Sequence, residues 1–185
     1  MPKVRRREAP SAPPRPPVAV IDVGSNSGRV MVYRQEKGGH LHVLAGSRAS
    51  LRLVRELDRT GRIPAESLER AFEALRDFRS VARGSGVKRI TAAGTSALRD
   101  ASNGPAFLRR VRRELGITMR TLSGLEEARY GFLGAVGGLP VEDGALFDLG
   151  GGSLQVARFR GRRLLGAFSV PLGGLRVSDA FLRSD

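Results

Sequence analysis

Cysteine is absent from the 185-residue sequence, which excludes disulfide bonds, thiolate zinc sites and a cysteine nucleophile. The sequence also lacks an apolar stretch long enough for a membrane span. Arg5, Arg6 and Arg7 are followed by a proline-rich stretch and not by the apolar core of an export signal. We therefore expect a cytoplasmic protein that does not enter a membrane.

Lysine is scarce: the chain has 3 lysines against 29 arginines, and its formal net charge is +14. A coding bias would explain the choice of arginine over lysine, but it would not explain the excess of positive charge. Such an excess favours polyanionic partners such as polyphosphate, phosphorylated nucleotides or nucleic acid. Because the sequence contains no recognisable helix-turn-helix or RNA-binding module, we expect no specific nucleic-acid binding.

Composition separates a leader from the remainder of the chain. Residues 1–17 hold six prolines and a small basic cluster but almost nothing to bury, which predicts a disordered, basic leader. The remaining residues suffice for one ordinary domain and part of another.

Two short segments, residues 22–27 and 148–153, share the frame Asp-x-Gly-x-x-Ser. Each follows an apolar run and precedes partly alternating residues, a pattern that predicts a β-hairpin with a carboxylate ending its first strand. Glycines let the turn approach a ligand, and successive N–H groups form a concavity for anions. We interpret both as phosphate-binding hairpins, with contacts from Gly24, Ser25, Asn26, Ser27, Gly150, Gly151, Gly152 and Ser153.

The same residue types are ordinary turn formers, so one copy alone would favour a plain hairpin turn. The repetition of the frame favours phosphate binding. Neither copy is a Walker A loop, because no Gly-Lys-Ser/Thr follows. Neither is a dinucleotide fingerprint, because the glycine spacing differs and a strand follows instead of a helix.

A third polar segment follows a predicted strand over residues 88–93. Thr95 and Ser96 fall near the start of a short helix, where hydroxyls and free N–H groups favour an anion. Arg99 could donate two parallel hydrogen bonds to phosphate oxygens. Alternatively, Thr95 or Ser96 is only a helix cap and Arg99 pairs with a surface carboxylate. Considered alone, the segment supports both interpretations equally.

Residues 123–127 predict the start of another helix, which runs toward residue 136. Ser123 followed by Glu126 fits a capping box, in which each side chain bonds the other residue's backbone amide. Glu126 therefore has a structural task. Glu127 has no such local task and is the better candidate for chemistry.

The order of predicted elements indicates an α/β protein with two related lobes. Residues 18–137 predict three strands, then helix, strand, helix, strand and helix, with the first of these helices at residues 64–81. Residues 138–185 begin the same order again, with strands at 145–148, 154–160 and 163–170 and a helix from 175. We therefore expect a complete first lobe, the start of a second, and a sequence that is a fragment or a truncated product.

With these motifs the sequence resembles the exopolyphosphatase and guanosine pentaphosphate phosphatase family, within the actin-like ATPase (ribonuclease H-like) fold group. Four stretches in order carry the resemblance and span the chain after the leader: AVIDVGSNS at 19–27, AGTSALRDA at 93–101, SGLEEAR at 123–129 and FDLGGGS at 147–153.

The resemblance implies hydrolysis of a terminal phosphoanhydride in inorganic polyphosphate or guanosine pentaphosphate. It places Glu127 on the family's catalytic base, Asp22 and Asp148 on carboxylates that hold a divalent metal, usually Mg²⁺, and Arg99 on a phosphate-contacting arginine. It leaves a homodimer open. The chemistry agrees, because two carboxylates facing a polyanion would repel it without a hard cation between them.

One residue departs from the family pattern. Two positions after Ser153, where family members usually carry glutamate, this chain has Gln155. An uncharged residue there favours an alternative, namely a module that binds polyphosphate or a guanosine alarmone with little turnover. A sugar or acid kinase of the same fold group is a third interpretation, which the Ser-Gly-x-Glu-Glu motif disfavours.

Overall fold

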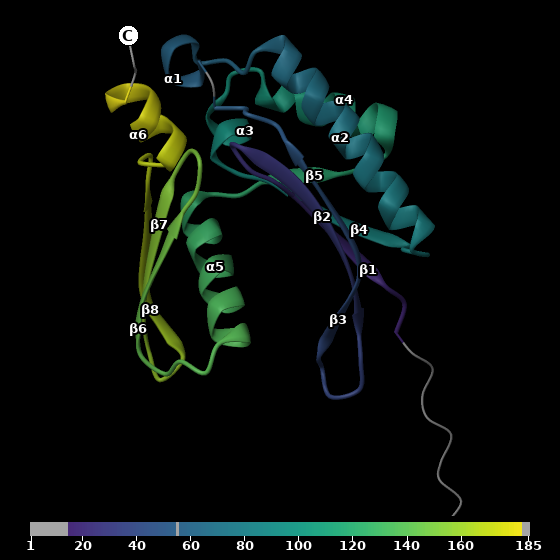
Figure 1. Cartoon of the computed structure of the whole chain (residues 1–185), viewed down its shortest axis with the longest axis vertical. Helices are drawn as coiled ribbons and strands as arrows, with labels where there is room; N and C mark the ends of the chain where they lie inside the picture. The colour runs from purple at the N-terminus through teal and green to yellow at the C-terminus, as the bar shows by residue number, and fades with distance from the viewer. Residues whose placement is uncertain (1–14, 55, 183–185) are drawn as a thin grey trace, which may run out of the picture.

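The computed structural model describes residues 15–54 and 56–182. Of the expected leader, residues 1–14 lie outside the described residues, and residues 15–17 form no helix or strand. The remainder builds two β-sheets with helices packed on them (Figure 1). No described helix combines the length and the apolar composition that crossing a bilayer requires.

The first sheet has the strand order β3-β2-β1-β4-β5. Its strands β1 (Val18–Val23), β2 (Ser27–Gln35) and β3 (Leu41–Ser50) are antiparallel neighbours, whereas β4 (Arg89–Gly94) and β5 (Met119–Thr121) continue parallel to β1. This order, with its antiparallel second strand, is that of the ribonuclease H-like sheet of actin-like ATPases. The fold class predicted from the sequence is confirmed.

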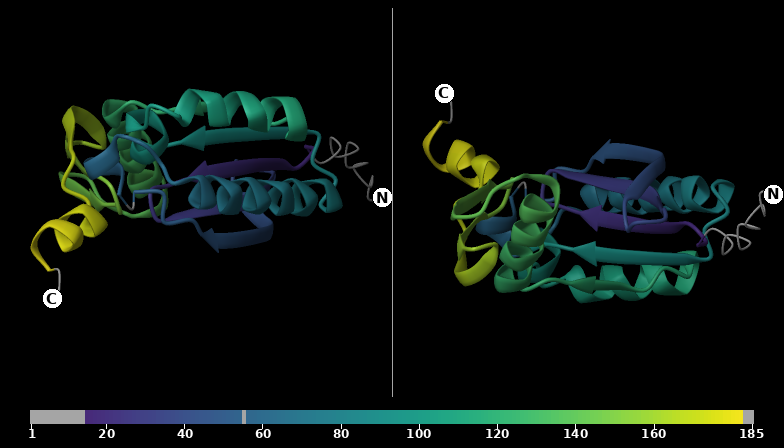
Figure 2. Two further views of the ribbon diagram at one scale, coloured as in Figure 1. Left: turned by 90° about the horizontal axis from the view of Figure 1, so that it is seen from above. Right: turned by 90° about the horizontal axis from the view of Figure 1, so that it is seen from below.

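Helices α2 (Ala65–Gly84) and α4 (Gly104–Leu115) cover one face of this sheet and pack against each other (Figures 1 and 2). Strand alternation sends Ala19, Ile21 and Val23 of β1 into that core, where each is at most 1% exposed. The intervening β1 residues, Val18, Val20 and Asp22, therefore lie on the opposite face of the sheet.

Two short helices precede and follow this layer. Helix α1 (Leu57–Thr60) was not predicted, because a four-residue helix carries too little hydrophobic periodicity to be recognised. Helix α3 (Ser96–Asp100) follows β4 as predicted. We call β1–β5 with α1–α4 the first lobe.

The second sheet has the order β6-β7-β8 and is antiparallel, with strands β6 (Gly144–Leu149), β7 (Leu154–Arg160) and β8 (Arg163–Val170). Helix α5 (Gly124–Gly138) packs on one face of it, and helix α6 (Gly174–Phe181) follows β8. We call α5, β6–β8 and α6 the second lobe.

Helix α5 packs with the second sheet, although the sequence placed it at the end of a first lobe spanning residues 18–137. Its buried side chains Phe132 and Val136 lie one helical turn apart and form a cluster with Ala157 and Phe159 of β7. The Phe132 and Phe159 ring centroids are 5.5 Å apart. Only this three-dimensional pairing reveals which sheet receives the helix.

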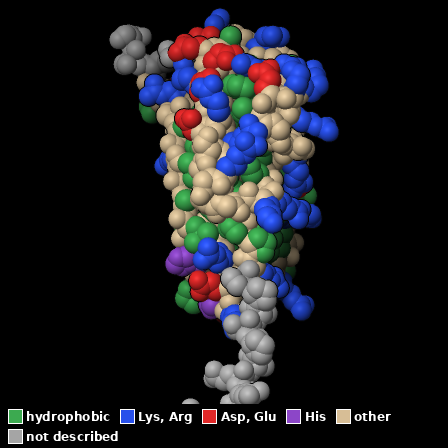
Figure 3. All heavy atoms as spheres, turned by 90° about the vertical axis from the view of Figure 1, so that its right-hand side faces the viewer, with side chains coloured by type: hydrophobic (Ala, Val, Ile, Leu, Met, Phe, Trp, Pro, Cys, Tyr) green, Lys and Arg blue, Asp and Glu red, His purple; other side chains and the backbone are tan. Residues whose placement is uncertain are grey.

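On the face of the molecule seen in Figure 3, basic side chains are scattered and lie among other residue types, with no single dense patch.

The Phe132–Phe159 contact predicts a stability difference between two positions of α5. Replacing Phe132, which is 5% exposed, with alanine should lower the free energy of unfolding by about 3–5 kcal/mol, because it leaves a cavity in a small cluster. Replacing Leu133, which is 57% exposed on the same helix, should change it by less than about 0.5 kcal/mol. Urea denaturation followed by circular dichroism measures both, and equal losses would contradict this packing.

Candidate active site

The two predicted hairpins adopt the same turn. In the first, the Gly24 amide donates to the Ser27 carbonyl at 3.0 Å. In the second, the Gly150 amide donates to the Ser153 carbonyl at 2.9 Å. The repeated sequence frame therefore corresponds to a repeated backbone structure.

The turns approach closely at two glycines of the second hairpin. A Cβ atom on Gly151 would lie 3.2 Å from the Cβ of Asn26. A Cβ atom on Gly152 would lie 2.5 Å from the hydroxyls of both Ser25 and Ser96, closer than real side chains come. The structure thus brings the loops after β1, β4 and β6 to one place.

Ser25 and Ser96 bond to each other at this junction. Their hydroxyl oxygens are 2.9 Å apart, and the residues are 4% and 2% exposed. Thr95 lies beside them, with its amide donating to the Val23 carbonyl at 3.1 Å, and no side chain caps α3. In this structure the two serine hydroxyls hold the loops together, and their role in phosphate binding stays a prediction.

Asp22 and Asp148 lie on the two sides of the junction. Asp22, at the end of β1, forms an ion pair with Arg29 of β2, with 3.2 Å between Oδ2 and Nε. Burial raises the pKa of Asp22 most; Arg29 opposes that rise, and the negative charge of Asp148 adds to it. Asp148, on β6, faces α5, because a Cβ atom on Gly131 would lie 3.4 Å from its Oδ2. Each aspartate lies two residues before the glycine whose amide closes one of the two turns.

A cleft of about 550 Å³ opens beside these residues. Both hairpins, two arginines and the start of α6 line it: Asp22, Gly24, Ser25, Asn26, Ser27, Arg29, Arg48, Leu149, Gly150, Gly151, Gly174 and Leu175. Carboxylates, amides, hydroxyls and guanidinium groups from distant parts of the chain therefore share one opening.

The donor set suits Mg²⁺, which binds through one or two carboxylates and keeps several waters or substrate oxygens as its other ligands. Asp22 lines the cleft, and Asp148 directly precedes Leu149, which also lines it. Within residues 15–54 and 56–182, no group of three or more His, Cys, Asp or Glu side chains is arranged as a metal site. A metal here would therefore depend on water and phosphate oxygens.

Glu127 lies in the first turn of α5, and its side chain is 10% exposed. The predicted capping box is confirmed: the Ser123 hydroxyl accepts from the Glu126 amide at 3.2 Å, and Glu126 Oε2 accepts from the Ser123 amide at 2.8 Å. Glu126 is engaged in the helix cap, whereas the neighbouring Glu127 contacts side chains of other elements.

Two side chains donate to the Glu127 carboxylate. Arg99 of α3 forms an ion pair with Oε1, and Gln155 Nε2 of β7 donates to Oε2 at 2.9 Å. Burial raises the pKa of Glu127 most; Arg99 opposes the rise, while the charges of Asp100 and Asp22 add to it. A carboxylate with a raised pKa is suited to accept a proton.

Gln155 is 4% exposed and connects several groups of the second lobe. Its Nε2 also lies 2.7 Å from the Ser153 hydroxyl and 3.2 Å from the Ser169 hydroxyl. A neutral amide there can donate to the ionised Glu127. A glutamate would place a second negative charge against it unless a cation lay between them.

Sequence reasoning did not identify Arg29 and Arg48 as parts of the cleft. Arg29 is the antiparallel partner of Asp22, so the hairpin register could have revealed it. Arg48 of β3 donates to the Ser27 hydroxyl at 3.2 Å, and its place depends on a β-bulge between β2 and β3 that the sequence does not show.

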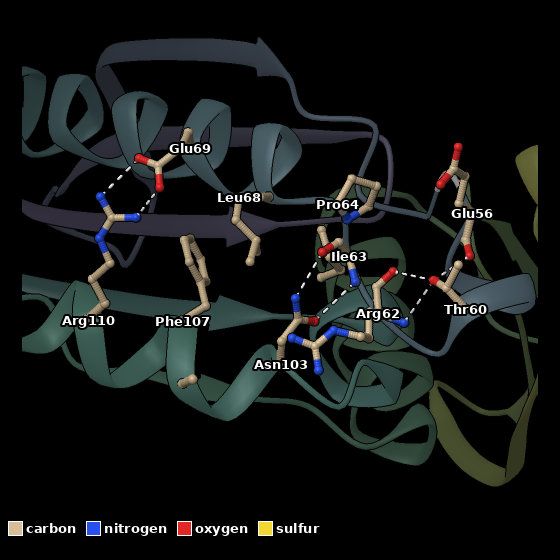
Figure 4. Close-up of a pocket in the computed structure, with 12 residues that line it drawn as sticks. Glu56, Thr60, Arg62, Ile63, Pro64, Leu68, Glu69, Asn103, Phe107 and Arg110 are labelled. Carbon is tan, nitrogen blue, oxygen red and sulfur yellow. Dashed lines mark hydrogen bonds and ion pairs between the residues drawn. The ribbon is translucent and has the colours of Figure 1, made fainter.

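A separate groove lies on the outer side of the first lobe, between the starts of α2 and α4 (Figure 4). Its polar side chains pair among themselves: Asn103 exchanges two hydrogen bonds with the Ile63 backbone, and Arg110 pairs with Glu69 (Figure 4). It contains none of the predicted site residues.

Comparison with known proteins agrees with this geometry. The model of the Ppx/GppA phosphatase family matches residues 31–185. Exopolyphosphatase 1 of Mycobacterium tuberculosis (strain H37Rv) is 34% identical over 170 residues, which cover 91% of this chain and 49% of the relative. The chain thus spans about half the length of the curated relatives it matches.

Solved structures show the same likeness. The crystal structure of an exopolyphosphatase from Cytophaga hutchinsonii has a TM-score of 0.85 and 29% identity, covering 91% of this chain and 55% of that one. The Ppx/GppA family member of Aquifex aeolicus has a TM-score of 0.78 and 28% identity, with coverages of 91% and 55%. On the family match and the shared fold, the chain belongs to the Ppx/GppA phosphatase family.

Proposed function

We propose that this chain provides the catalytic cleft of a phosphoanhydride hydrolase that removes the terminal phosphate of inorganic polyphosphate, of guanosine pentaphosphate, or of both. The observation that carries the proposal is Glu127, a largely buried carboxylate held by Arg99 and by Gln155, which also bonds Ser153 of the second hairpin. The exopolyphosphatases among its relatives support polyphosphate as the substrate. A cytoplasmic location and a homodimer remain expectations.

In this proposal the backbone amides of the two hairpins, with Arg29 and Arg48 at the cleft, bind the phosphate chain. Phosphoryl transfer requires little covalent work from the protein, so orientation and charge stabilisation dominate. A divalent cation held by Asp22 and Asp148 would supply charge neutralisation of the phosphate oxygens.

Glu127 orients a water molecule and accepts one of its protons as the water oxygen bonds to the terminal phosphorus. The bond from that phosphorus to the bridging oxygen breaks, and the shortened phosphate chain leaves with the bridging oxygen. Arg99, which contacts Glu127 in this structure, keeps the base ionised and close to the cleft. The products are inorganic phosphate and a chain that is one phosphate shorter.

Gln155 favours a second candidate, a polyphosphate- or alarmone-binding module with little turnover. It satisfies the Glu127 carboxylate with a hydrogen bond but brings no negative charge to attract a metal. In that case the cleft would bind the phosphate chain without cleaving it.

The role of Glu127 predicts a large loss on a minimal substitution. Glu127→Gln should lower phosphate release by about 10²–10⁴-fold while leaving polyphosphate binding intact, because the amide keeps the shape but accepts no proton. Glu126→Gln is the matched control: it should keep turnover, since glutamine also completes a capping box. Wild-type rates in Glu127→Gln, measured by inorganic phosphate release with Mg²⁺, would exclude Glu127 as the base.

The raised pKa of Glu127 predicts that kcat decreases at low pH. Only the ionised carboxylate accepts a proton, so kcat should fall as the pH drops through the pKa of Glu127, at a midpoint above the ordinary value of 4.5. Arg99→Gln should move this decrease to higher pH, because Arg99 lowers the pKa. Stopped assays over a pH series at saturating substrate measure it, and a midpoint at or below the ordinary value would contradict the assignment.

Gln155→Glu separates the two candidates. If the chain is a hydrolase, the wild type releases phosphate, and the added carboxylate should lower the Mg²⁺ concentration for half-maximal rate by about 10–100-fold. If it is a binding module, the wild type should bind polyphosphate saturably without releasing phosphate, and Gln155→Glu should gain release. Phosphate release and equilibrium binding are measured side by side across an Mg²⁺ series.

A further inference from the structure

Arg176 of α6 connects the second lobe to two helices of the first. Its side chain is 10% exposed, and one terminal nitrogen lies 3.1 Å from an Asp58 carboxylate oxygen and 3.2 Å from Asp100 Oδ2. Asp58 belongs to α1 and Asp100 to α3. A single guanidinium group therefore joins three elements that are distant in the sequence.

The backbone around Arg176 is fixed against the second phosphate hairpin. The Gly174 amide donates to the Gly150 carbonyl at 2.8 Å, and the Leu175 amide donates to the Gly151 carbonyl at 3.0 Å. A Cβ atom on Gly173 would overlap the backbone of Gly151 and Gly152. Arg176 thus projects from a helix start that the hairpin itself holds in place.

Asp100 links Arg176 to Arg99, and Arg99 contacts Glu127. While Asp100 Oδ2 is held by Arg176, its Oδ1 accepts from Arg99 Nε at 3.1 Å. Arg99 then donates through its terminal nitrogen to the Leu122 carbonyl at 2.7 Å and to Glu127. The Asp100 carboxylate bonds both arginines and therefore orients the Arg99 guanidinium, which in turn holds Glu127.

The Nε atom of Arg176 finds no hydrogen-bond partner among the described residues, although it is buried. A buried donor without a partner costs free energy, so stability alone is a weak reason for an arginine here. The residue lines a cavity of about 330 Å³ together with Arg99, Asp100, Ser153 and Ser169. This cavity lies next to the groups that contact Glu127 and Gln155.

We propose that Arg176 is a positioning residue for the hydrolysis: by fixing Asp100 it directs Arg99 onto Glu127. The role rests on the proposed function, because it acts through the proposed base. It assigns a task in the reaction to a residue that does not line the two-hairpin cleft.

The first measurement follows Glu127 itself in the full chain without added metal. Arg176→Met should raise the pKa of Glu127, read by carbon NMR of its carboxyl group, because Arg99 loses its fixed orientation and Asp100 loses a compensating charge. The groups facing Glu127 are Arg99 and Asp100 from α3, Asp22 from β1 and Gln155 from β7. Arg176→Lys, which keeps the charge without the planar fork, should give a smaller rise in the same direction.

The second measurement is turnover. Arg176→Met should lower kcat by roughly 10–100-fold and leave KM within about twofold, because it misplaces the base without removing a phosphate contact. Arg110→Met is the matched control, since Arg110 also pairs with two carboxylates, Glu69 and Glu114, but lies outside the cleft. It should lower stability without changing kcat or the pKa of Glu127.

A double substitution tests the route through Asp100. In the Asp100→Asn background, Arg176→Met should leave the pKa of Glu127 unchanged, because the link is already broken.

An equal shift in both backgrounds, no shift in either, or the same kcat loss in Arg110→Met would overturn the proposal. If the wild-type chain releases no phosphate, the proposed function fails, and the NMR titrations still decide the role of Arg176; should Arg176→Met not fold, Arg176→Lys decides it.

Discussion

The close approach of the two glycine turns is the constraint on which the cleft depends. A Cβ atom on Gly152 would lie 2.5 Å from the hydroxyls of Ser25 and Ser96, so a side chain there would displace these hydroxyls. Asp22 is fixed to the first turn and Asp148 to the second, so their separation follows from this contact. The glycines are therefore required for geometry between lobes, in addition to the freedom they give each turn.

Charge is the second constraint, because carboxylates gather at a site that we propose binds a polyanion. The charges of Asp100 and Asp22 raise the pKa of Glu127, the charge of Asp148 raises that of Asp22, and Arg99 and Arg29 offset part of these rises. Arg29 pairs with Asp22, while Arg99 joins Asp100 to Glu127. The arginine-rich composition thus has a specific use at the cleft, beyond a general attraction for anions.

The sequence predicted those features that local pattern determines. Both hairpin turns, the capping box at Ser123 and the strands over residues 154–160 and 163–170 agree with the structure. Helix α1 was missed because four residues show no period. The assignment of α5 to a lobe was missed because its apolar face alone does not say which sheet it meets.

Side-chain partners across the chain were the least predictable part of the site. The Ser25–Ser96 bond joins residues 71 apart, and the Arg176–Asp100 pair joins residues 76 apart. Neither has a local signal, because each exists only after both sheets have folded and met. The roles of Glu127, Asp22 and Asp148 came from motifs, whereas the network that surrounds them came from the fold.

Glu127 and its arginine belong to different lobes: the glutamate is carried by a helix on the second sheet, and Arg99 follows a strand of the first. A hinge rotation between the sheets would therefore change the length of this ion pair, together with the Arg176 pairs, and change how strongly the glutamate attracts a proton. In the proposed enzyme, the basicity of Glu127 would thus depend on how the two lobes are placed relative to each other.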